Sequence, residues 1–94
     1  MRQVIDGRGY DTASMRVLAD RGEYSDGNYC GSDSLRVTRT GVLCFVVTSN
    51  GQDMYRRSYI EPVSVETARE RIDGWKLNED EIAALTAAGV IKGG

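Results

Sequence analysis

The stretch Leu35–Thr48, LRVTRTGVLCFVVT, decides the fold, because it is the only long apolar run in the chain. Up to Val37, apolar and polar side chains alternate, which is the pattern of a β-strand with one solvent-facing side. After Gly41 the residues up to Val47 are apolar without a break, which indicates a strand covered on both faces. We therefore expect a β-hairpin that turns at 39–41 and forms the core of the protein.

The part of the chain before this hairpin predicts short extended segments joined by turns. A short edge strand is expected at 2–5, followed by an Asp-Gly-Arg-Gly turn at 6–9, since Asp and Gly tolerate positive φ. A helical turn at 12–14 then leads into a strand near 15–19. Residues 21–33 carry three glycines and no periodicity, and they predict a long irregular loop that is either functional or a simple connection.

The part after the hairpin begins with a turn at 49–53 and a third strand at 54–60. Two short helices follow. Ser64 is a good N-cap for the first helix, and the second begins with Asn78 and Glu81 in the spacing of a capping box. Glycines at 74 and 89 are the expected stops. Val65, Ala68 and Ile72 are expected on one side of the first helix, and Ile82 and Leu85 of the second are expected to face inward.

These elements predict an α+β fold, a small antiparallel sheet around the hairpin 35–48 that is covered by two short C-terminal helices. The chain has 94 residues, 40% of them hydrophobic, which fits a single domain over 1–94. No apolar run approaches the ~18 residues of a membrane helix, and the start, MRQVIDGRG, lacks the apolar core of a signal peptide. We therefore expect a cytoplasmic protein that has no contact with a membrane.

Several residues and motifs on which catalysis depends are absent from the sequence. It contains no histidine and no P-loop, GxGxxG, CxxC or GxSxG pattern. Cys30 and Cys44 allow one disulfide at most, and without a secretion signal we favour free thiols. The expectation is a non-enzymatic protein without a metal or a cofactor.

The charges are distributed unevenly along the chain. Residues 1–34 contain six acidic and four basic residues, residues 35–60 one and four, and residues 61–94 seven and four. A basic middle and an acidic end can give a small protein two faces of opposite sign. Such a separation is more often only a solvated surface.

The acidic end supplies the first candidate site, a protein-binding face. Its members are carboxylates on and beside the two expected helices: Glu66, Glu70, Asp73, Glu79, Asp80 and Glu81. Such a face can oppose Lys and Arg clusters that normally hold phosphates, and electrostatics then sets the rate and orientation of binding. The partner would be a protein with a basic surface.

The basic middle supplies an alternative site for nucleic acid. Its members are arginines and tyrosines of the expected strands and turn: Arg36, Arg39, Tyr55, Arg56, Arg57 and Tyr59. Two tyrosines flanking an arginine can stack on bases, but they can equally pack as cross-strand pairs. The net charge of −2 and the lack of a basic tail argue against direct binding of nucleic acid.

Three parts of the sequence together resemble small uncharacterised proteins of bacterial phages and plasmids. They are Tyr10-Asp11-Thr12, the stretch LRVTRTG at 35–41 that leads into Phe45, and IEPVSVETA at 60–68. The chain departs from the pattern of those proteins at Val37, where they carry Tyr. The resemblance implies a mobile-element setting, in which compact non-enzymatic proteins often inhibit host defence. Anti-CRISPR proteins are among them, and they commonly occlude a basic nucleic-acid channel with an acidic surface.

The resemblance therefore implies an inhibitor that acts through its acidic face on a nucleic-acid-binding effector complex. We expect the protein to be a monomer or a homodimer. A minor alternative rests on the C-terminal Gly93-Gly94, which resembles the tail of ubiquitin-like modifiers and sulfur carriers. In those proteins a strand leads into the tail, whereas here the last helix is expected to end at Gly89.

Overall fold

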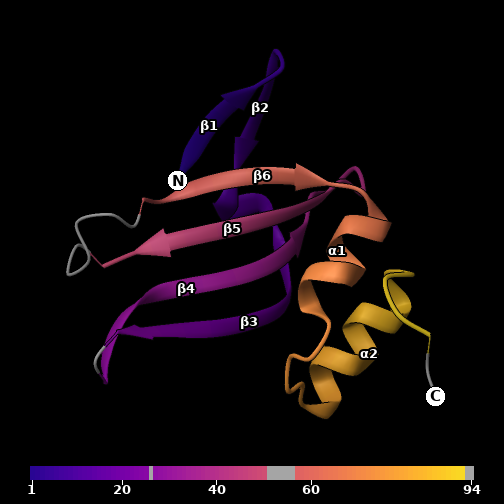
Figure 1. Ribbon diagram of the computed structural model, residues 1–94. Helices are drawn as coiled ribbons and strands as arrows, with labels where there is room; N and C mark the ends of the chain where they lie inside the picture. Colours follow the sequence, from indigo (N-terminus) through magenta and orange to yellow (C-terminus); the bar gives the residue numbers. More distant parts are fainter. Residues whose placement is uncertain (26, 51–56, 93–94) are drawn as a thin grey trace.

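The computed structural model describes residues 1–25, 27–50 and 57–92. Figure 1 shows the strands between residues 16 and 63 gathered into one layer, with the hairpin of residues 2–11 projecting from it and the helices beside one end of it. The elements, in chain order, are β1 (Arg2–Ile5), β2 (Arg8–Asp11), the 3-10 helix η1 (Thr12–Ser14), β3 (Arg16–Ser25), β4 (Asn28–Val37), β5 (Leu43–Ser49), β6 (Tyr59–Val63), α1 (Val65–Ile72) and α2 (Glu79–Ala87).

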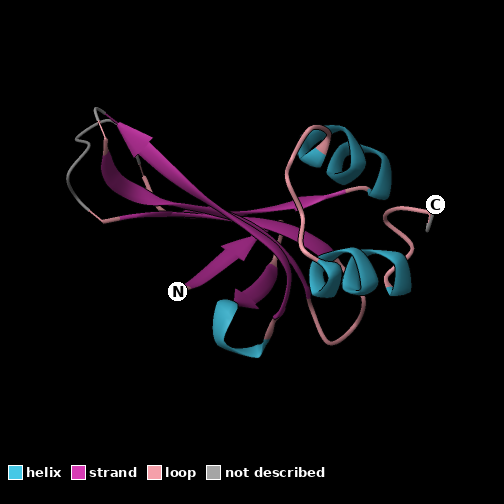
Figure 2. Cartoon of the chain, turned by 90° about the horizontal axis from the view of Figure 1, so that it is seen from below, coloured by secondary structure: helices cyan, strands magenta, loops and turns pink. Residues whose placement is uncertain are grey.

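The main sheet is antiparallel, with strand order β3-β4-β5-β6, and β1 and β2 form a separate hairpin. Figure 2 shows that this sheet is strongly twisted and that α1 and α2 lie near the same end of it. The predicted α+β class is confirmed. The predicted central hairpin is confirmed as well, because β4 pairs with β5 and Gly41 N–H donates to the Thr38 carbonyl across the turn.

The unbroken apolar run in β5 is explained by two cores, one on each face of the sheet. Leu43 and Phe45 belong to the larger core, in which the sheet packs against Ala68, Ile72, Leu85 and Val90 of the C-terminal part. Cys44 and Val46 belong to a smaller core with Ile60, against which Ile5, Tyr10, Met15 and Val42 pack. A strand in the middle of a sheet that is covered on both faces has no side left for polar residues.

Both helices begin at the expected caps. The Ser64 hydroxyl accepts a hydrogen bond from Thr67 N–H at 3.1 Å. Asn78 accepts from Glu81 N–H at 2.8 Å, while the Glu81 carboxylate accepts from Asn78 N–H at 3.1 Å, which completes the capping box. Ala68, Ile72 and Leu85 are buried as predicted.

The inward orientation predicted for Ile82 is wrong, because this side chain is 43% exposed. Val65, at the start of α1, is 40% exposed. In α2 the reason is that Glu81 faces strand β3, so the next residue is turned about 100° around the helix axis and away from the sheet.

The irregular loop predicted at 21–33 is also wrong. Most of this segment belongs to β3 and β4, which pair from Arg16 and Val37 to Ser25 and Asn28. A bulge interrupts the pairing after Glu23, and most residues of the segment 21–33 are polar or glycine on both faces of the sheet. The segment therefore has no apolar alternation by which a strand is recognised.

The third strand starts and ends later than predicted. Strand β6 spans Tyr59–Val63, so Arg57 and Ser58 precede it and Pro62 lies within it. An edge strand tolerates proline because one side of it needs no ladder hydrogen bonds. Positions 54–56 of the predicted strand, positions 51–53 of the predicted turn, and Gly93-Gly94 lie outside the described residues.

Side chains cap both edges of the main sheet. On β3, Asp20 N–H donates to the Glu81 carboxylate at 3.0 Å. On β6, Ile60 N–H donates to the side-chain carbonyl of Gln3 at 2.9 Å. Because outward-facing positions alternate along a strand, Pro62 faces outward as Ile60 does, and it has no N–H to offer. These are devices that prevent a sheet edge from pairing with another chain.

Candidate functional site

A row of four residues crosses the uncovered half of the sheet, on the same face as the helices. Arg21 pairs with Asp33, Asp33 with Val47, and Val47 with Tyr59, so each strand contributes one side chain. Directly opposite residues in antiparallel strands point to the same side of the sheet. The neighbouring row contains Phe45, which is buried beneath the helices. The row from Arg21 to Tyr59 is therefore the first cross-strand row that the helices leave uncovered.

The end of α1 and the segment after it form a wall beside this row. Trp75 N–H donates to the Ile72 carbonyl at 2.9 Å, and Gly74 adopts a φ of 83°, which reverses the chain after the helix. The reversal places the Trp75 ring edge-to-face against Phe45, with ring centroids 6.3 Å apart. Row and wall enclose a cleft of about 350 Å³, here called the aromatic cleft. It is lined by Arg21, Asp33, Phe45, Val47, Tyr59, Arg71, Asp73 and Trp75.

Two arginines lie over the two rings of the cleft. The guanidinium carbon of Arg21 is 5.1 Å from the centre of the Trp75 ring, and that of Arg71 is 5.1 Å from the Phe45 ring. Each arginine is also oriented by a carboxylate, Arg21 by Glu23 at 2.6 Å and Arg71 by Glu61. The hydrogen bond to Glu61 raises the pKa of Arg71 above its ordinary value. Both cations are therefore held in place before any ligand arrives.

The chemistry of the cleft suits binding. It offers aromatic rings, two oriented guanidinium groups and the carboxylates of Asp33 and Asp73. Tryptophan, tyrosine and arginine are the residue types that carry most of the energy in protein–protein contacts. Within the described ranges, no group of three or more His, Cys, Asp or Glu side chains is placed to hold a metal ion.

The acidic residues singled out from the sequence are found at the helices. Glu66 lies in the first turn of α1, and Glu70 and Asp73 lie at its end, all three exposed; Asp73 lines the cleft. Glu79 and Asp80 are exposed in the first turn of α2. Glu81 differs from the others, because its carboxylate accepts hydrogen bonds from Asn78 and Asp20 and serves the fold.

The Arg and Tyr residues singled out for nucleic acid do not gather on one surface, as far as the structure describes them. Arg36 lies opposite Cys44 and therefore faces the smaller core, where its Nε donates to Ser34 at 2.9 Å. Tyr59 lies opposite Val47 on the other face, in the aromatic cleft. Arg39 is exposed in the β4–β5 turn, and Arg57 is exposed before β6. Tyr55 and Arg56 lie outside the described residues.

Sequence reasoning missed the arginines of the cleft, Arg21 and Arg71. The sequence predicts Arg21 at the start of a loop, and only the register of β3 brings it to the sheet row. The one available signal was Trp75, the single tryptophan, set just after a helix stop.

No protein-family model matches the chain, and neither a curated protein nor a solved structure was found to be similar to it. Among the described helices, none has the length and apolar character needed to cross a membrane.

Proposed function

We propose that this protein is a non-enzymatic protein-binding module whose contact surface is centred on the aromatic cleft. The observation that carries the proposal is the clustering of Trp75, Tyr59, Arg21 and Arg71 around one open cleft. Such residues contribute most to the binding energy when they lie in a pocket that a partner can fill and from which it can exclude water. The rigid cross-strand row and the paired arginines lower the ordering cost of binding.

The partner favoured by this surface is a protein with basic side chains. Asp73 lies in the cleft itself, and Glu66, Glu70, Glu79 and Asp80 present exposed carboxylates on the adjoining helices. Complementary charge of this kind raises the rate of association and fixes orientation more than it adds affinity. The inhibition of a host defence complex, which the resemblance to phage and plasmid proteins implies, stays a more specific form of the same proposal.

The capped edges of the sheet favour contact through a face. Glu81, Gln3 and Pro62 occupy positions at which a partner strand would have to form hydrogen bonds. A partner that fills the cleft meets side chains instead of a free strand edge.

The test compares binding by four proteins: the wild type, a cleft variant, a charge variant and a control. The partner is first captured from cells of the native host with the wild-type protein and then purified. Tyr59→Ser changes the cleft, whereas Tyr24→Ser removes an exposed tyrosine that packs near Gly22 on the opposite face. The charge variant carries Glu66→Lys and Glu70→Lys, which are both exposed.

We expect Tyr59→Ser to weaken binding by about 10-fold or more, through faster dissociation. The charge variant should slow association, and the Tyr24→Ser control should bind as the wild type does. Equal binding by the wild type, Tyr59→Ser and the charge variant would contradict the proposal.

A further inference from the structure

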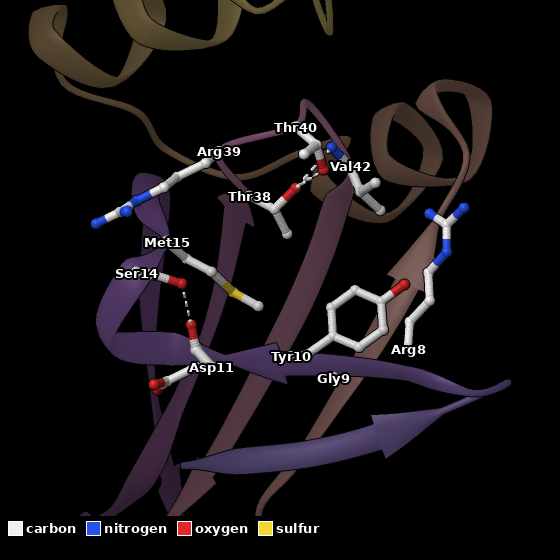
Figure 3. A pocket seen from close by; sticks show the side chains of 10 residues that line it. All are labelled: Arg8, Gly9, Tyr10, Asp11, Ser14, Met15, Thr38, Arg39, Thr40 and Val42. Carbon is white, nitrogen blue, oxygen red and sulfur yellow. Dashed lines mark hydrogen bonds between the residues drawn. The ribbon is translucent and has the colours of Figure 1, made fainter.

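A groove lies over the β4–β5 turn, at the end of the sheet crossed by β2 and η1. It consists of two hollows that meet at the turn and lie on opposite faces of the sheet: Met15 and Val42 of the first pack on the smaller core, whereas Arg16 of the second lies opposite Val37, which packs on the larger core. The first, of about 190 Å³, is drawn in Figure 3, and the second, of about 320 Å³, shares Ser14, Thr38 and Arg39 with it. This turn groove is defined here by Arg8, Tyr10, Ser14, Arg16, Thr38 and Arg39.

Three arginines follow one another along the groove. Arg8 lines the first hollow, Arg39 lines both, and Arg16 lines the second. All three are exposed, and none forms a side-chain ion pair or hydrogen bond within the described part of the chain. By contrast, Arg2, Arg21 and Arg71 are each paired with a carboxylate.

The groove is also poor in opposing charge. Asp11 is the one carboxylate among the described residues that line it. That carboxylate is already engaged, since it accepts from Ala13 N–H at 3.0 Å and from Arg2 at 3.3 Å. Although the chain as a whole has a net charge of −2, this end of the sheet concentrates unneutralised positive charge.

The rest of the lining can contact a nucleotide. Figure 3 shows the ring of Tyr10 between Met15 and Arg8, with Arg39 on the other side of the hollow and reaching outward. The hydroxyls of Thr38 and Thr40 lie 3.2 Å apart beside it. Guanidinium groups bind phosphate oxygens through two parallel hydrogen bonds, and an aromatic ring accepts any base by stacking.

We infer that the turn groove binds a short segment of single-stranded nucleic acid that passes around the β4–β5 turn, with Arg8, Arg39 and Arg16 on its phosphates. A free nucleotide has the same chemistry but occupies only one hollow. A run of carboxylates on a protein would meet the arginines but has no base to place beside Tyr10. This site is distinct from the aromatic cleft, and it contains only Arg39 of the residues that sequence reasoning assigned to nucleic acid.

The experiment measures the fluorescence anisotropy of labelled oligothymidylate and oligouridylate of about twelve nucleotides, titrated with the full chain at about 20 to 200 mM salt. The groove variant carries Arg8→Gln, Arg16→Gln and Arg39→Gln. The control variant carries Arg57→Gln, Lys76→Gln and Lys92→Gln, which remove the same charge at exposed positions that do not line the groove. Circular dichroism verifies that both variants are folded.

We expect the wild type to bind with a log–log salt slope of about −2, as three phosphate contacts on a single strand predict. The groove variant should lose about 10-fold or more in affinity, while the control variant should lose less than about 3-fold. Pyrophosphate and adenosine monophosphate should compete only at much higher concentration than an unlabelled oligonucleotide.

Three results would overturn the inference. The first is no binding of either oligonucleotide at low salt, and the second is an equal loss in both triple variants. The third is competition by a free nucleotide, or by an oligoglutamate peptide, as strong as that by the unlabelled oligonucleotide. The nucleotide result would reassign the groove to small phosphates, and the peptide result to an acidic protein.

Discussion

Glu81 Oε2 accepts a hydrogen bond at 3.0 Å from the backbone N–H of Asp20, which lies 61 residues earlier in the chain. The other oxygen of the same carboxylate closes the capping box at Asn78. One side chain therefore starts α2, covers an N–H on the edge of β3, and fixes the helix against the sheet. The sequence predicts the capping box, but the contact of the same carboxylate with β3 makes Glu81 part of the scaffold between helix and sheet.

The first prediction concerns this carboxylate. Glu81→Ala should lower the free energy of unfolding by about 1 to 3 kcal/mol, because two backbone N–H groups lose their acceptor. Asp80→Ala is the matched control: its carboxylate accepts no hydrogen bond within the described ranges, and only its helix-dipole effect, under about 1 kcal/mol, should be lost. Urea unfolding monitored by circular dichroism measures both, and equal losses would contradict the scaffold role.

The second prediction concerns the turn of the central hairpin. Gly41 has a φ of 91°, a conformation that costs any residue with a Cβ about 1 to 2 kcal/mol. Gly41→Ala should lower stability by that amount, although nothing lies within 4 Å of the added methyl group. Gly9→Ala serves as control, since Gly9 has open space around it and no positive φ. A stable Gly41→Ala protein would mean that the turn can change its conformation freely.

The third prediction concerns the thiols. Cys30 is 5% exposed and Cys44 is fully buried, and both are free. Burial also raises the pKa of Cys44, so that less of it is present as the reactive thiolate. Ellman's reagent should therefore react slowly with the folded protein and release two equivalents in guanidinium chloride. Rapid labelling of Cys44 under native conditions would show that the smaller core opens readily.

The fourth prediction concerns acid. The hydrogen bond from Ala13 N–H, assisted by Arg2, holds the pKa of Asp11 below its ordinary value of 3.8. Because the pKa of Asp11 is lower in the folded state, its carboxylate contributes fully to the free energy of unfolding at a pH above the ordinary pKa. This contribution is lost as the pH falls through the lowered pKa of the folded state. A carboxyl-detected NMR titration should place Asp11 below 3.8, and Asp11→Asn should flatten the acid limb of the stability curve. A midpoint at or above 3.8 would contradict the capping geometry at η1.

The features that could be predicted from the sequence are those set by neighbouring residues. The caps at Ser64 and Asn78 follow from side chains that bond to the backbone three residues ahead. The hairpin around Gly41 follows from a turn between two apolar runs. In each case the deciding contacts lie within a few positions of one another.

The features that could not be predicted depend on pairing between distant segments. Strands β3 and β4 join through glycines, serines and aspartates, and the rings of Tyr24 and Tyr29 fill the space that Gly22 leaves open. The aromatic cleft needs Arg21 of β3 to meet Trp75 beyond α1. No local pattern encodes such a meeting, because it exists only once the strand register is set.

The two-sided core of β5 has a consequence for how the protein reaches its native state. In a strand with one polar side, slipping by one residue would bury charge, and that penalty keeps the strand aligned. In β5 both alternating sets are apolar, Leu43 with Phe45 on one face and Cys44 with Val46 on the other. A slip of one residue would therefore exchange one apolar face of the strand for the other. The register of β5 therefore depends on the tight turn at Gly41. A chain that forms this turn incorrectly would collapse into a compact, misregistered intermediate.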